Sequence, residues 1–332
     1  MTTHRSSPLS QFIVSRRKGL KGLLSAGLVV AFATGTGITA ASAQDKVVRI
    51  GFQPYGKLVL LKSRSTLEPA LKKLGYDVEW KEFPSGPPLL EALNVGAIDF
   101  GNTGEAPPIF AQAAGAPLRY VAFDPPAPKG EAILVPKDSP LKTLSDLKGK
   151  KIALNKGSNV HYLLVKALEK AGIKYTDVTP VFLAPADARA AFESGAVDAW
   201  VIWDPYQAAA EVATQARTLA NAEGIVANYQ FYFSSKPFLA ANKPIVDVIL
   251  AQLNAVDDWT VGDMNAVAEQ LSPSAGLPVP VLKLALQRQS YGIKPITDSV
   301  IAQQQQVADT FFALGLIPNA IKISDVAEGA GS

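Results

Sequence analysis

One short pattern occurs twice in this chain and constrains its fold more than any other feature. Gly-Ala-Ile-Asp at residues 96–99 returns as Gly-Ala-Val-Asp at residues 195–198. Each copy follows a stretch of helical pattern and leads into a short apolar run. Nine residues after each glycine comes an acid followed closely by proline, Glu105 and Asp204. The repeat predicts two similar α/β units that face each other across a cleft, where such proteins bind ligands.

The order of elements along the chain predicts how these two units connect. Strand and helix patterns alternate, which favours parallel sheets with helices on both faces. We expect the chain to cross between the units near Ala132 and again near Ser234, because extended segments occur at both places. Two crossings form a hinge that suits closure around a ligand. The predicted division is a leader at 1–43, a first lobe made of 44–131 and 235–332, and a second lobe at 132–234.

The N-terminal segment has the composition of a secretory signal peptide. Residues 1–43 contain five basic residues and no acidic one, an apolar stretch at 23–33 and a final Ala-Ser-Ala. This pattern predicts cleavage after Ala43 and a periplasmic location. A membrane anchor is disfavoured, because the apolar stretch is shorter than the roughly 18 residues that a span needs. Both an ordinary leader and a twin-arginine leader, with Arg16 and Arg17 as the pair, fit the sequence.

Composition excludes several classes of function once the leader is set aside. The chain has 32 basic and 29 acidic residues, so loss of five basic ones leaves 27 against 29. This balance gives no support for nucleic-acid binding, which depends on neutralising phosphates. Cysteine is absent, and His161 is the only histidine beyond the leader. We therefore expect no catalytic residues, no metal and no cofactor. His161 itself is interpreted as a solvated or hydrogen-bonded helix residue.

Small residues at three predicted helix starts form the candidate anion site. A helix start offers free backbone N–H groups and the positive end of the helix dipole, and glycine lets a ligand approach the backbone closely. Taken singly, each such start is better explained by ordinary helix capping, and the occurrence of three at equivalent strand ends is what indicates a shared anion site. The three pairs are Ser85-Gly86, Thr103-Gly104 and Gly157-Ser158.

Side chains at other strand ends complete the predicted cleft. Trp203 follows a predicted strand and is expected to provide an apolar wall for the carbon part of a ligand. Trp200 is assigned to the core instead. Gln53, at the end of the first strand, is expected to form a hydrogen bond in the cleft, and Glu105 and Asp204 are expected to cap the helices that they precede.

These segments resemble a known family over nearly all of the mature chain. The matching motifs are Glu-Phe-Pro-Ser-Gly-Pro at 82–87, Glu-Ala-Leu-Asn-Val-Gly at 91–96, the segment 101–115 that begins Gly-Asn-Thr-Gly-Glu-Ala-Pro-Pro, Leu-Lys-Gly at 147–149, Lys-Gly-Ser at 156–158, Pro-Ala-Asp-Ala-Arg-Ala-Ala-Phe at 185–192 and Trp-Asp-Pro-Tyr at 203–206. The chain resembles the aliphatic sulfonate-binding proteins, within the nitrate, sulfonate and taurine group of periplasmic binding proteins of ABC transporters.

The resemblance implies both a fold and a function. It implies a two-lobed periplasmic-binding-protein fold with two crossings (type II), which acts as a monomer and delivers an alkanesulfonate to an ABC transporter permease. The ligand positions that it implies are Gln53, Ser85, Gly86, Thr103, Gly104, Ser158 and Trp203. In this sequence Asn102 and Glu105 replace the usual Ser and Asp of the family's Gly-Ser-Thr-Gly-Asp loop. Preferred chain length stays open, and taurine, nitrate or another small anion are alternative ligands.

An enzyme on the same fold is the alternative of a different class. The superfamily includes a sulfinate desulfinase that requires a cysteine and a pyrimidine synthase that resembles a histidine- and iron-dependent enzyme. This chain has no cysteine and one histidine outside the leader, so a binding protein is favoured. With uncharged donors holding a strong-acid anion, affinity is expected to be nearly flat between about pH 5 and about pH 9.

Overall fold

The two copies of the repeated pattern form the same helix ending in the computed structural model, which describes residues 46–328. Gly96 follows α3 (Gly86–Asn94) with φ 71°, and Gly195 follows α6 (Pro185–Glu193) with φ 73°. Both values lie in the left-handed region that glycine adopts without a steric penalty. The predicted leader and its cleavage site lie outside the described residues.

The aspartate of each copy ties its turn to a neighbouring strand. Asp99 Oδ2 accepts a hydrogen bond from the Arg49 backbone N–H at 2.9 Å, and Asp198 Oδ2 accepts one from the Lys151 N–H at 2.8 Å. Arg49 lies in β1 (Lys46–Phe52) and Lys151 in β6 (Lys151–Leu154), and these two strands occupy the same place in the strand order of their sheets. The pattern is therefore a structural signature of the α/β unit, and it repeats because the unit repeats.

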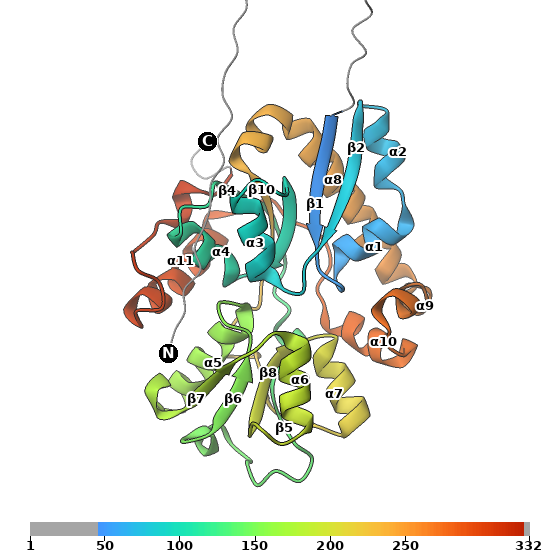
Figure 1. Ribbon diagram of the computed structural model, residues 1–332. Helices are drawn as coiled ribbons and strands as arrows, with labels where there is room; N and C mark the ends of the chain where they lie inside the picture. Colours follow the sequence, from blue (N-terminus) through green and yellow to red (C-terminus); the bar gives the residue numbers. More distant parts are fainter. Residues whose placement is uncertain (1–45, 329–332) are drawn as a thin grey trace, which may run out of the picture. The chain divides into compact units, whose positions relative to one another are not determined.

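Two five-stranded sheets form the framework of the described chain (Figure 1). The first sheet has the strand order β2-β1-β3-β10-β4 and the second the order β7-β6-β8-β5-β9. The strands are β1 (Lys46–Phe52), β2 (Tyr76–Glu82), β3 (Phe100–Gly104), β4 (Leu118–Asp124), β5 (Glu131–Val135), β6 (Lys151–Leu154), β7 (Thr179–Phe182), β8 (Ala199–Trp203), β9 (Arg217–Asn221) and β10 (Gln230–Ser235).

The sheets are mixed, which the sequence prediction of parallel sheets missed. The first three strands of each order pair in parallel, whereas β10 is antiparallel to β3 and β4, and β5 is antiparallel to β8 and β9. Each antiparallel strand is the one that the chain forms directly after crossing from the other sheet. The chain enters the new sheet from the end opposite to that at which the parallel strands begin. The strand that it forms therefore runs antiparallel to its neighbours. Strand β9, the edge partner of β5, was not predicted.

Helices cover both faces of each sheet, as the alternation predicted. On the first sheet, buried residues of α1, α2, α8, α9 and α10 form one core, and those of α3, α4 and α11 form another. On the second sheet, α5 packs on one face and α6 on the other. The remaining helices are α1 (Lys57–Arg64), α2 (Leu67–Lys72), α4 (Pro107–Ala113), α5 (Asn159–Lys170), α7 (Tyr206–Thr214), α8 (Lys236–Gly262), α9 (Met264–Ala275), α10 (Val279–Arg288) and α11 (Asp298–Ala313).

Each sheet with its helices is one lobe, and two segments connect the lobes. The first connection, residues 125–130, joins β4 to β5 close to the predicted crossing at Ala132. The second, residues 222–229, joins β9 to β10. The prediction of a second crossing near Ser234 is wrong, because residues 230–235 are already hydrogen-bonded between β3 and β4. The sequence marked this stretch as extended but did not reveal the sheet to which it belongs.

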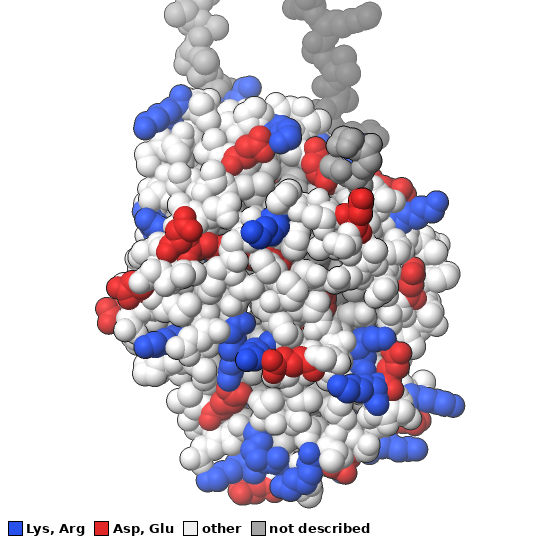
Figure 2. All heavy atoms as spheres, turned by 180° about the vertical axis from the view of Figure 1, so that it is seen from behind, with Lys and Arg blue, Asp and Glu red and all other residues white. Residues whose placement is uncertain are grey.

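The surface carries both signs of charge. On the face shown in Figure 2, Lys and Arg lie among Asp and Glu, and the basic residues gather mainly toward the end formed by the second lobe. No broad basic surface of the kind that binds nucleic acid is visible on this face. Among residues 46–328, no helix has the length and apolar character needed to cross a membrane.

Candidate functional site

A cavity of about 280 Å³ is lined by residues of both lobes and of the connections between them. The first lobe contributes the ends of β1, β3 and β4 and the starts of α1, α3 and α4. The second contributes the starts of α5 and α7 and the end of β8. Of the seven predicted ligand residues, five line it: Gln53, Gly86, Gly104, Ser158 and Trp203.

Two helix starts, one from each lobe, face this cavity. Ser85 is the N-cap of α3 and Ser158 is the N-cap of α5, and both have extended backbone conformations. Neither hydroxyl accepts a hydrogen bond from the first turn of its helix, and Ser158 Oγ instead donates to the Asn155 carbonyl at 2.7 Å. The first turn of α5 therefore keeps N–H groups that its N-cap side chain does not satisfy, which suits an anion. The second and third residues of α3 are prolines without an N–H, so Gly86 is the backbone donor left at the start of that helix.

The third predicted helix start is wrong in its geometry. Thr103 and Gly104 end strand β3, and α4 begins later, at Pro107. Its first two residues are Pro107 and Pro108, which have no N–H to offer a ligand. The pair does lie before a helix, but Glu105 and Ala106 separate it from the first residue of that helix.

Ser85 and Thr103 do not line the cavity, although their neighbours Gly86 and Gly104 do. Both are buried, and Thr103 Oγ1 donates to the Gly104 carbonyl at 3.0 Å. The two lobes approach closely at Gly104: a Cβ added to it would lie 2.8 Å from Cγ of Asn159 in α5. Glycine is required there because any side chain would push against the other lobe.

Trp203 and Gln53 lie on the cavity wall. Trp203 ends β8 and is partly buried, with one side against the core of the second lobe, so its indole can pack against an apolar ligand group. Trp200 is fully buried, which confirms its assignment to the core. Gln53 Nε2 donates to the Asn102 carbonyl at 3.2 Å, which leaves its carbonyl oxygen available.

Three cationic side chains that the sequence prediction missed also line the cavity: Lys57, Arg189 and Arg288. Each already has an acidic partner. Arg189 Nε donates to Glu193 at 2.7 Å, and Arg288 donates to Glu211 at 2.6 Å. The site therefore combines neutral donors with cations whose charge is partly compensated. Arg189 lies within a motif that carried the family resemblance, whereas nothing in the sequence pattern pointed to Arg288.

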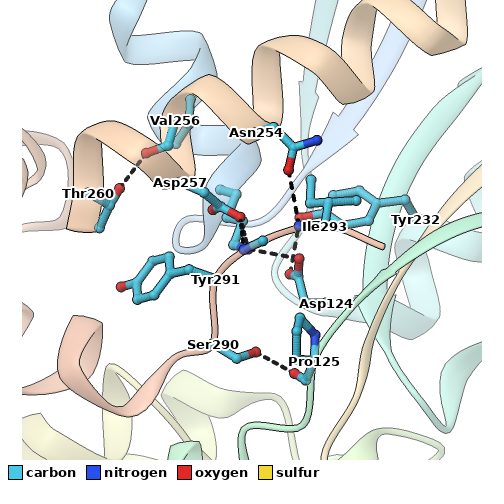
Figure 3. Close-up of polar contacts among 12 residues, drawn as sticks. Asp124, Pro125, Tyr232, Asn254, Val256, Asp257, Thr260, Ser290, Tyr291 and Ile293 are labelled. Atoms are coloured by element: carbon cyan, nitrogen blue, oxygen red, sulfur yellow. Dashed lines mark hydrogen bonds and ion pairs between the residues drawn. The ribbon is translucent and has the colours of Figure 1, made fainter. Parts of the chain in front are cut away.

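Lys57 is the buried centre of a charge cluster beside the cavity. Its Nζ lies 2.7 Å from Asp124 Oδ1 and 2.7 Å from Asp257 Oδ2. Figure 3 shows these carboxylates, from β4 and α8, pointing toward one position. Burial raises the pKa of Asp124 to about 6, although the Lys57 ammonium acts in the opposite direction. The cluster joins three elements of the first lobe next to the first connection.

A segment after α10 is held to the same cluster (Figure 3). The Gly292 N–H donates to Asp257 at 2.6 Å, and the Ser290 hydroxyl donates to the Pro125 carbonyl, where the first connection begins. The end of α10 is thereby fixed against the hinge, and this positions Arg288.

Asp204 and Arg288 form an ion pair across the lobes. Asp204 Oδ1 accepts a hydrogen bond from the Ala208 N–H at 3.0 Å, as predicted for a helix cap, and lies 3.4 Å from Arg288 Nη1. Burial raises the pKa of Asp204 to about 7, and Arg288 opposes this shift. Ala208 and Ala209 of α7 also pack on Ala285 of α10, so the lobes share apolar as well as charged contacts here.

His161 is buried behind the site and does not line the cavity. Its Nδ1 accepts a hydrogen bond from the Gly157 N–H at 3.3 Å, and its Nε2 lies 2.8 Å from the Tyr175 hydroxyl. Burial, with Lys156 nearby, lowers its pKa to about 4. The ring is therefore neutral at physiological pH, and the interpretation as a hydrogen-bonded helix residue is confirmed while solvent exposure is not.

Two buried glutamates meet at the hinge behind the cavity. Glu105 Oε2 accepts a hydrogen bond from the Tyr229 N–H at 3.0 Å, so it does not cap α4 as predicted. Glu131 Oε2 accepts one from Asn159 Nδ2 at 2.6 Å, and the same nitrogen donates to Asn228 at 3.0 Å. These bonds link both connections to α5. Within residues 46–328, no group of acidic or histidine side chains is arranged to hold a metal ion.

Comparison with known proteins assigns the chain to a family. A family model described as NMT1/THI5 like matches residues 71–302. A relative from Escherichia coli (strain K12), named as an aliphatic sulfonates-binding protein, is 42% identical over 306 residues, which are 92% of this chain and 95% of the relative. A Bacillus subtilis (strain 168) relative of the same name is 33% identical over 93% of this chain and 94% of the relative.

A solved structure agrees with these relatives in fold. The alkanesulfonate-binding protein SsuA from Xanthomonas axonopodis pv. citri, bound to MOPS, is 43% identical, with a TM-score of 0.83 over 86% of this chain and 99% of that chain. The desulfurization enzyme DSZB is 15% identical with a TM-score of 0.61, and this likeness shows only a shared fold.

Proposed function

The chain belongs to the NMT1/THI5-like family, among relatives named for aliphatic sulfonate binding, and from this premise we propose that it captures a small organosulfonate for an ABC importer. The observation that carries the proposal is the cavity between the lobes, into which two uncapped helix starts and the indole of Trp203 project. Backbone N–H groups suit the sulfonate oxygens, and the indole suits the carbon chain.

The cavity size and wall chemistry support a small ligand. About 280 Å³ is at or below the lower end of the range for small-molecule sites, which favours a short alkanesulfonate. The ligand positions that we propose are the five lining residues Gln53, Gly86, Gly104, Ser158 and Trp203. Ser85 and Thr103 do not line the cavity, and their proposed role is to shape the loops that present Gly86 and Gly104 to the ligand.

Delivery to a membrane permease completes the proposed role. After cleavage of the leader following Ala43, the protein acts as a monomer in the periplasm. A permease accepts the ligand from the closed, two-lobed form. We propose a non-catalytic role, because the relatives that match nearly the whole chain are named as binding proteins. Each sheet with its helices forms one lobe, and residues 125–130 and 222–229 form the hinge between the lobes.

A thermal-shift screen of the mature chain tests the ligand class. We expect short alkanesulfonates to raise the melting temperature more than taurine, nitrate or sulfate, since a ligand at 100 times its Kd adds about 2.7 kcal/mol to stability. Buffers must contain no sulfonate group. Stabilisation by nitrate or sulfate and by no sulfonate would refute the proposed ligand class.

A further inference from the structure

We infer that the protonation of Glu105 and Glu131 controls binding of the anion in the cavity. Binding of the anion is then coupled to uptake of a proton by these two carboxyls. This inference rests on the proposed function, because it takes the ligand to be an anion bound in the cavity between the lobes.

The two carboxyls lie immediately behind the cavity wall. Glu105 follows Gly104 and Glu131 follows Gly130, and both glycines line the cavity. Glu105 is 2% exposed and Glu131 is 0% exposed. Each has one carboxyl oxygen with no hydrogen-bond partner, Oε1 in both cases. A buried carboxylate with an unpaired oxygen is costly, so the neutral acid is favoured at both positions.

Neither carboxyl has a cation to balance it. Among the ion pairs of residues 46–328, none involves Glu105 or Glu131. The groups that interact with these carboxyls are neutral amides, backbone N–H groups and a tyrosine, and the two glutamates also interact with each other. These neighbours are Asn159 and Tyr162 of α5 and Asn228 and Tyr229 of the second connection. Gln304 of α11 donates to the backbone carbonyl of Glu105.

The direction of the coupling follows from charge. Burial raises the pKa of Glu105 to about 7, and burial together with Glu105 raises the pKa of Glu131 well above its usual range. A bound sulfonate keeps its negative charge at all ordinary pH values and repels an ionised carboxylate beside it. Ligand binding therefore raises both pKa values further, and affinity is highest at low pH and falls as pH rises through the pKa of the free protein.

This inference differs from the expectation of a nearly flat pH dependence. That expectation considered only groups in contact with the ligand. The pair was invisible in the sequence because Glu105 and Glu131 come together only after the chain has crossed between the lobes.

Calorimetric titration with ethanesulfonate tests the inference without any mutation. The mature chain is titrated in bis-Tris, imidazole and Tris, which contain no sulfonate and differ in ionisation enthalpy. We expect proton uptake near neutral pH and a loss of affinity of about 3- to 10-fold between about pH 6 and about pH 9, where each unit of pKa change corresponds to a factor of ~10. Affinity constant within twofold, with no proton uptake, would overturn the inference.

Two isosteric variants assign the effect to these residues. Glu105→Gln and Glu131→Gln keep an acceptor for the Tyr229 N–H and for Asn159 Nδ2, and we expect each to reduce the pH slope. The double variant should reduce the slope further, to the part contributed by Asp124 and Asp204, which line the cavity and also have raised pKa values. The matched control is Glu223→Gln, because Glu223 is half-exposed and pairs with Lys129 away from the cavity. A slope that persists unchanged in the double variant would overturn the assignment. If ethanesulfonate and longer alkanesulfonates fail to bind at every pH, the proposed function fails, and this inference with it.

Discussion

Replacement of Gly104 by alanine tests how closely the lobes must approach. The added Cβ would lie 2.8 Å from Cγ and Oδ1 of Asn159 and 3.0 Å from its Cβ. Asn159 cannot easily yield, because its Nδ2 is bonded to Glu131 at 2.6 Å and to Asn228 at 3.0 Å. Overpacking of this kind costs about 1–3 kcal/mol, which corresponds to a loss of affinity of about 5- to 150-fold.

We expect this free-energy cost to destabilise the closed form of the protein and not the folding of either lobe. Gly104 belongs to β3 of the first lobe and Asn159 to α5 of the second, so an opened protein relieves the clash. We therefore expect Gly104→Ala to weaken ethanesulfonate binding in calorimetry while the melting temperature of the ligand-free protein changes little. Gly262→Ala is the control, since no atom lies within 4 Å of its added Cβ and Gly262 does not line the cavity. Wild-type affinity in Gly104→Ala would refute the close approach, and an equal fall in ligand-free stability would refute its assignment to closure.

Three further predictions concern the cavity wall, the buried histidine and the repeated turn. Trp203→Ala should weaken alkanesulfonate binding by roughly 1–3 kcal/mol, more for longer tails, and binding to the wild type should change tryptophan fluorescence; unchanged affinity would place Trp203 in the core. His161→Gln should leave the pH dependence of affinity unchanged, because the pKa of His161 is lowered to about 4; a pH slope that disappears in this variant would contradict its neutral, buried role. Asp99→Ala and Asp198→Ala should each lower the free energy of unfolding by about 1–3 kcal/mol in urea titrations and leave affinity unchanged, since each aspartate bonds a strand N–H away from the cavity; a loss of binding with normal stability would contradict this structural role.

The sequence predicted the parts of the fold that depend on local signals. Gly96 and Gly195 mark helix ends because only glycine adopts their left-handed backbone cheaply, and the repeat they form indicated two α/β lobes. The strand that returns to the first sheet was recognised as a strand, but its partners were not, because hydrogen bonding to β3 and β4 is a long-range property. Local pattern also did not show that residues 57–72 form two helices, which are separated because Ser65, with a φ of 51°, ends α1.

The site was predictable where residues adjoin a strand end and not where distant elements meet. Gly86, Gly104, Ser158 and Trp203 follow recognisable strands, and the structure places all of them on one cavity. Arg288 reaches that cavity from a helix that follows the second crossing, so no local pattern connected it to the site.

Crystallisation of the mature chain with pentanesulfonate, in a buffer without sulfonates, tests the central claim most directly. The account predicts sulfonate oxygens within hydrogen-bond distance of backbone N–H groups at the starts of α3 and α5, with the alkyl chain against Trp203. A sulfonate bound at the Arg288 end of the cavity with its tail away from Trp203, or bound outside the cavity, would contradict it.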